Sequence, residues 1–218
     1  MGGRGFLDKA HYTAHFVVEG RDGRDLGSRI KAIRAFAKGG NEIVNTVPLM
    51  TRADPFPSLP VTHPDGRRML PIHGIFPTSA LGAFHREYVA LKADFADRMA
   101  EAGVTIAEFF ASIAGVGLLY EPVFYWPDER YAYHDRMTPD YLAGKLPDNP
   151  PNEAARALID AMIAAIVALM RKHGSTHFQL GRLYPYASER DAVAGGFIRG
   201  LKAQLDPDNI INPGALGL

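Results

Sequence analysis

The order of the predicted elements indicates an α+β fold built on a ferredoxin-like βαββαβ antiparallel sheet with helices packed on one face. Two observations predict it. Two strand–helix–strand patterns follow each other within residues 1–126, and an additional strand pattern follows the second of them. A Pro-rich connector over 127–151 then leads to C-terminal helices, a strand and an extended tail over 152–218. The total of 218 residues suits one domain with appended elements.

The first strand–helix–strand pattern is predicted from hydrophobic spacing. His11–Glu19 is rich in aromatic and β-branched residues, which favours a strand. Asp22–Lys38 places leucine and isoleucine at helical spacing and ends at two glycines, which favours a helix. Asn41–Val47 is the second predicted strand.

The second pattern repeats this order after a stretch with six prolines over 48–71. Met69–Phe76 is the predicted strand, and Thr78 or Ser79 is the predicted cap of a long helix that ends at Gly103. Two further strands are predicted, Thr105–Ser112 and Val116–Trp126.

The C-terminal part is predicted to hold two helices. Asn152–His173 is the first, and Thr176–Tyr186 is strand-like. Ser188 is the predicted cap of the second helix. Its inward residues are expected to be Phe197, Leu201 and Leu205. The tail, Asp206–Leu218, contains two prolines and is expected to lie extended.

Composition excludes several classes of function. Lys+Arg and Asp+Glu each number 24, and nucleic-acid binding needs an excess of positive charge, so we expect no nucleic-acid partner. There are no cysteines, which excludes thiol chemistry and zinc knuckles. We find no apolar leader and no apolar run long enough to cross a bilayer, so we expect no membrane association and a cytoplasmic protein.

Nucleotide and metal motifs are also missing. Gly115-Val-Gly117 lacks the third glycine of a dinucleotide fingerprint and precedes a strand. No Walker, nucleophile-elbow or His-Glu-x-x-His pattern occurs. The eight histidines show no ligand spacing, and we expect no metal site.

Aromatic residues are concentrated at the ends of predicted strands. Tyr120–Trp126 and Tyr184-Pro-Tyr186 fit either a core with hydroxyls at its rim or a pocket for a ring-containing substrate. In the second case Arg182 and Gln179 would orient the substrate, and Tyr184 and Tyr186 would donate to it. The candidate bases are His73 and His177, and the candidate wall residues include Tyr120 and Trp126.

The tail carries a resemblance to a known family. Leu205-Asp-Pro-Asp-Asn-Ile-Ile-Asn-Pro-Gly214 resembles the C-terminal signature of FAD-linked oxidases of the vanillyl-alcohol oxidase and p-cresol methylhydroxylase type. The stretches Leu70–Pro77, Tyr120–Trp126 and His177–Pro185 are similar to that family's substrate or cap domain. The resemblance implies hydride transfer from a small organic substrate to FAD. It also implies a partner, a flavin-binding domain or subunit, which matches nothing in this chain.

The resemblance also implies site residues. Phe178 and Gln179 stand where phenol-oxidising members carry a Tyr-Arg pair, which implies that they line the substrate site. Tyr120 stands in the stretch where some members attach flavin covalently, and Asn212 lies in the tail near the cofactor. No Tyr-Arg dipeptide occurs, so a phenolate clamp would need Arg182 with Tyr184 or Tyr186.

A second interpretation is a ferredoxin-like module that binds a small ligand or serves assembly without catalysis. The absence of a flavin site favours it, and the Asn-Pro-Gly tail does not. An RNA-binding fold shares the βαββαβ order but lacks the charge and the aromatic sheet motif. The sequence leaves a homodimer open.

Overall fold

The computed structural model describes residues 12–42, 62–113, 115, 117–140, 142–179, 181–184, 186 and 191–218. The chain divides into two units, Met1–Ser58 and Leu59–Leu218. Among the described residues, no helix combines the length and apolar character that a membrane span requires.

The described part of the first unit contains one helix, α1 (Gly23–Phe36). The Asp22 side chain accepts hydrogen bonds from the backbone N–H groups of Arg24 and Asp25, which satisfies free donors at the helix start. The predicted helix is therefore confirmed. The predicted strand His11–Glu19 is wrong for residues 12–19, which have no regular structure. Asn41–Val47 lies mostly outside the described residues.

The second unit is α+β, and its antiparallel sheet confirms the predicted fold class at that level. The strands are β1 (Arg68–Pro71), β2 (Gly74–Phe76), β3 (Thr105–Ile113) and β4 (Gly117–Trp126). β4 is central: β3 pairs with one edge along its length, and β1 and β2 follow one another along the other edge. The pairing register is the same for β1 and β2, so together they follow the course of one strand.

Pro122 explains why the predicted strand Met69–Phe76 is divided. Ile72 stands opposite Pro122 in the register and donates its N–H to the Pro122 carbonyl at 3.0 Å. Proline has no N–H to return the second hydrogen bond of the pair, so the ladder is interrupted there. The interruption leaves His73 between the two strands.

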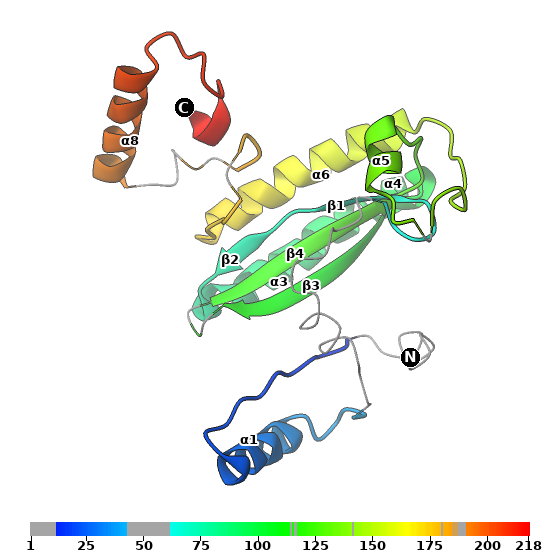
Figure 1. The fold of residues 1–218 in the computed structure, drawn as a ribbon, viewed down its shortest axis with the longest axis vertical. Helices are drawn as coiled ribbons and strands as arrows, with labels where there is room; N and C mark the ends of the chain where they lie inside the picture. The colour runs from blue at the N-terminus through cyan, green and yellow to red at the C-terminus, as the bar shows by residue number, and fades with distance from the viewer. Residues whose placement is uncertain are drawn as a thin grey trace. The chain divides into compact units, whose positions relative to one another are not determined.

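Two long helical segments cover one face of the sheet (Figure 1). The predicted helix from residue 78 to 103 is divided into α3 (Thr78–Asp94) and α4 (Ala96–Ala102), and Gly103 ends it with a φ of 68°. Pro77 precedes α3 without a side-chain cap, so the predicted Thr78 or Ser79 cap is wrong. The second segment is α6 (Glu153–Lys172), which begins at the predicted Asn152 cap.

The core lies between the sheet and these helices. β4 contributes Tyr120, Phe124 and Trp126, and the buried side of α6 supplies most of the apolar residues that face them. Gly74 is required here, because a side chain would collide with the Phe76 ring. The buried apolar residues of α6 are Ala155, Leu158, Ile159, Met162, Ile163, Ile166 and Met170.

The remaining elements depart from prediction in several places. The connector contains a short helix, α5 (Ala132–Met137). Within Thr176–Tyr186 the only described β-interaction is a single bridge from Thr176 to Ile75. The final helix is α8 (Ala192–Leu205), capped by Asp191, and Ser188 lies outside the described residues. The expectation that its apolar residues face inward is wrong, since Phe197, Leu201 and Leu205 are exposed.

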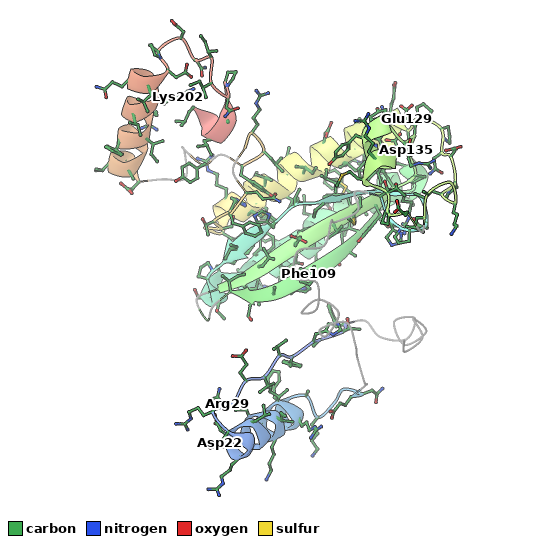
Figure 2. All side chains as sticks on the ribbon, viewed as in Figure 1. Asp22, Arg29, Phe109, Glu129, Asp135 and Lys202 are labelled. Atoms are coloured by element: carbon green, nitrogen blue, oxygen red, sulfur yellow. The ribbon has the colours of Figure 1, made fainter. Side chains whose placement is uncertain are left out.

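The tail is not extended as predicted but folds into turns. Asp206 accepts hydrogen bonds from the N–H groups of Ile210 and Ile211, and Lys202 pairs with the same carboxylate (Figure 2). A short 3-10 helix, η2 (Ala215–Gly217), follows, and the Leu216 N–H donates to the Gly181 carbonyl at 2.6 Å.

Candidate functional site

Four residues that the sequence singled out lie together at the interruption between β1 and β2. We call His73, His177, Phe178 and Tyr184 the His73 cluster. Phe178 stacks on the His73 ring with centroids 4.0 Å apart, and Tyr184 stacks on His177 at the same distance. The segment that carries three of them is held along the outer edge of β2 by the paired backbone bonds of Ile75 and Thr176.

At the backbone of His73, side chains of the cluster form the hydrogen bonds that a neighbouring strand would form. The backbone N–H of His73 donates to Tyr184 Oη at 2.8 Å. His177 Nδ1 lies 2.7 Å from the His73 carbonyl oxygen, so this nitrogen carries the proton and donates. Both backbone groups of a residue that is 1% exposed are thereby satisfied.

The hydrogen bonds also assign the protonation of the His73 ring. The Phe178 N–H donates to His73 Nε2 at 3.3 Å, so Nε2 has no proton. Nδ1 therefore carries it and lies 3.3 Å from Tyr184 Oη. Burial, together with the nearby His177, lowers the pKa of His73 to about 4. His73 is neutral near pH 7, with both ring nitrogens engaged inside the protein.

Tyr184 is the polar centre of the cluster. Its hydroxyl oxygen accepts from the backbone of His73 and faces the protonated ring nitrogen of the same residue. Burial raises the pKa of Tyr184, and the negative charge of Glu121 adds to the rise. The hydroxyl is therefore protonated at neutral pH.

Glu121 lies opposite the His73 cluster in the register of the sheet. The common register of β1 and β2 places His73 opposite Glu121 on β4, and Phe109 on β3 is its partner on the other side. Residues opposite each other in antiparallel strands share a face of the sheet. Glu121 and the His73 cluster therefore lie on the side away from α3 and α6.

This side, the open sheet face, is mainly apolar. Phe109, which is labelled on β3 in Figure 2, belongs to this face and is 53% exposed. Glu121 is half-buried, and it forms no hydrogen bond or ion pair with any residue that the structure describes. Burial raises the pKa of Glu121. The remaining members of the face are Met69, Pro71, Ile75, Thr105, Ala107, Ala111, Ile113, Leu119, Val123 and Tyr125.

The other residues predicted for the site lie outside the cluster, although the N–H of Tyr186 donates to the Tyr184 carbonyl oxygen at 2.9 Å. Tyr120 faces α3 within the core, where its hydroxyl lies 2.9 Å from His85 Nδ1. Trp126 is buried at the far end of β4 and donates to Asp128. Of the remaining predicted residues, Gln179, Arg182 and Asn212 are exposed and Tyr186 is half-buried.

Sequence reasoning missed Glu121, Phe109 and Asp128. The alternation of β4 and β3 was the available signal, since it places Glu121 and Phe109 away from the helix-facing aromatics. Asp128 is fully buried and holds Arg68 and Arg156 at the end of the sheet. Burial alone would raise the pKa of Asp128, but hydrogen bonds from Arg156, Asn152 and Trp126 outweigh it and the pKa lies below its ordinary range.

The described residues contain no group of three His, Asp or Glu side chains arranged to hold a metal ion. The site therefore offers a hydrogen-bonded histidine cluster, in which the His73 ring is neutral, beside a carboxylate on an apolar surface. Compared with known proteins, the chain matches no protein-family model, no curated protein and no solved structure.

Proposed function

We propose that this chain is the substrate-binding, or cap, portion of an FAD-dependent oxidoreductase that works in the cytoplasm with a flavin-binding domain or subunit. The reaction is the oxidation of an alcohol, phenolic or hydroxy-acid substrate by hydride transfer to the flavin. The observation that carries the proposal is the open sheet face: an apolar surface with one carboxylate and a polar cluster at its edge.

The chemistry of this face fits a flat ring system and a small substrate between two protein parts. Its exposed apolar members give contact area without a phosphate-binding loop, which agrees with a nucleotide held mainly by another domain. The flavin would supply the hydride acceptor. The residues of this chain would orient the substrate and exclude water, with Glu121 and Tyr184 as polar groups on that side.

The ferredoxin-like topology is part of the same proposal. What supports it is the order strand, helix, strand, strand, helix over 68–172, with helices on one face of an antiparallel sheet. This order matches the first five elements of βαββαβ.

Co-expression with a flavin-binding partner tests the function. The neighbouring upstream DNA is the first place to look for its reading frame. We expect the two chains to purify as a complex with the visible absorbance of a flavin, and to reduce a dye with an alcohol, phenolic or hydroxy-acid substrate only when both are present. A colourless mixture without turnover would contradict the proposal.

A matched pair of variants locates the contact. Phe109→Ala removes an exposed ring from the open sheet face, and Tyr133→Ala removes one of similar exposure, 59%, from α5. We expect Phe109→Ala to weaken the complex or its turnover by about tenfold, a loss of the size expected for a buried aromatic contact, and Tyr133→Ala to leave both near the native value.

A binding module without catalysis is the second candidate. The observation that favours it is that the His73 cluster uses its polar atoms within the protein. Both ring nitrogens of His73 and the Nδ1 proton of His177 form hydrogen bonds with other groups of this chain. Ligand binding that persists without any flavin-dependent turnover would select this alternative.

A further inference from the structure

Glu121 is a carboxylate that no described residue neutralises. It lies on the central strand of the sheet, half-buried among apolar neighbours, and no described cation or hydrogen-bond donor pairs with it. The raised pKa of Glu121 has desolvation by burial as its cause. A charged group without a partner in such a place costs free energy, which a ligand of opposite charge recovers on binding.

Aromatic rings surround this carboxylate on the same face. Phe109 is its direct partner across the β3–β4 pair, where opposite Cβ atoms lie about 5 Å apart. On the other side stands the His73 cluster, and the negative charge of Glu121 contributes to the raised pKa of Tyr184 in that cluster. The faces of such rings attract cations.

Charge decides which ligand fits. A carboxylate-bearing ligand would place a second negative charge beside Glu121 in a poorly solvated setting, and a neutral ligand would leave the existing charge unpaired. An organic ammonium supplies the missing positive charge, and its apolar body gains contact with Phe109 and the neighbouring apolar residues.

We propose that Glu121, with the ring of Phe109, binds the ammonium group of a small organic amine whose apolar body lies on the open sheet face. The inference goes beyond the proposed function and does not depend on it, because it concerns the binding of an amine and not the reaction. The binding itself needs no flavin, so the two proposals fail separately.

The test is a titration of the full chain labelled with ¹⁵N, followed by NMR. The three probes have similar shape and different charge: benzylamine, benzyl alcohol and benzoate. We expect benzylamine to shift the amide signals of Phe109, Glu121 and Val123 and to bind about tenfold more tightly than benzyl alcohol, with benzoate weaker still. Equal affinity for the amine and the alcohol, or shifts confined to other parts of the chain, would overturn the proposal.

Two charge-removing variants complete the experiment. Glu121→Gln keeps the shape of the side chain and is expected to abolish the preference for benzylamine. Glu101→Gln removes the same charge from the exposed end of α4 and is expected to preserve it. Thermal unfolding of Glu121→Gln checks that the variant is folded.

A loss of preference in both variants would mean attraction by net charge alone and would overturn the proposal. Amide shifts at Phe109 and Glu121 that change with protein concentration in the absence of amine would identify a second copy as the occupant, which would also overturn it.

Discussion

At the scale of single residues, the side chains of Tyr184 and His177 form hydrogen bonds that the backbone of a neighbouring strand forms elsewhere in a sheet. They satisfy the N–H and the carbonyl of His73 exactly where the sheet ladder is interrupted. The sequence made these residues candidates because they are chemically versatile. The structure shows in addition that each supports the local fold. The effect of a substitution on activity must therefore be separated from its effect on stability.

Tyr184→Phe isolates the hydrogen bond. The substitution keeps the ring and leaves the buried N–H of His73 without its acceptor, so we expect a loss of about 1–3 kcal/mol in the free energy of unfolding, measured by urea denaturation. Tyr133→Phe, whose side chain is exposed on α5, is the control and should change stability by less than about 0.5 kcal/mol. Equal effects of the two substitutions would show that Tyr184 Oη does not stabilise this edge.

The neutral His73 ring makes a prediction about pH. Its pKa in the folded chain, about 4, lies below the ordinary value of 6.5, so the fold favours the neutral form. The stabilisation is complete above pH 6.5 and is lost as the pH falls towards 4. We expect the free energy of unfolding to fall between about pH 7 and about pH 5, and the slope to decrease in His73→Gln, which is neutral throughout.

NMR titration of the histidine rings checks this directly. A His73 signal that titrates at the ordinary value, with the same slope in both proteins, would contradict the assigned protonation. Glu121 has the opposite sign, because its raised pKa favours folding at lower pH, and it therefore reduces the net slope in the acidic range.

At the scale of elements, hydrophobic periodicity predicted the helices and strands that bury one face. β3, β4 and α6 were found close to their predicted bounds, because alternation and helical spacing follow directly from facing a core. The interruption at His73 could not be predicted in this way. It depends on Pro122 standing opposite Ile72, and that register is a tertiary property.

The same limit explains the other errors. The pattern of residues 12–19 favours a strand, yet a strand requires a partner, which no described residue provides. α8 shows helical spacing of apolar residues, but spacing alone does not say whether anything covers them, and they are exposed. For the site, the residue types identified the His73 cluster. Glu121 was missed because its distinguishing feature is that no described residue forms a hydrogen bond or ion pair with it, and a sequence does not show this.

The ion pairs around Asp128 join β1, the end of β4 and the start of α6. Asp128 is fully buried, and loss of its charge would leave Arg68, which is 8% exposed, without a counter-charge and would leave the half-buried Arg156 with Glu129 alone. We expect Asp128→Asn to lower the free energy of unfolding by about 3–5 kcal/mol, measured by urea denaturation.

Asp148→Asn is the matched control for this pair of charges. Asp148 pairs with Arg130 but its side chain is 93% exposed, so the expected loss is below about 1 kcal/mol. Similar losses in both variants would mean that burial does not determine the strength of the Asp128 contacts.

At the scale of the whole molecule, the core belongs to the second unit alone. Every member of the buried apolar cluster lies between Ile72 and Met170, and α1 in the first unit has no buried residue. A unit with its own core can fold by itself. Whether the second unit folds without residues 1–58 is therefore a question that truncation can decide.

We expect the chain from Leu59 to Leu218 to unfold cooperatively, with a free energy of unfolding within about 1 kcal/mol of the second unit's transition in the full chain, because no described core contact is removed. Circular dichroism and urea denaturation measure the stability, and ¹⁵N spectra compare the amides of β3 and β4 in the two proteins. Unchanged spectra would show that the open sheet face is open in the full chain. Shifts at Phe109 and its neighbours, with lost stability, would contradict both expectations.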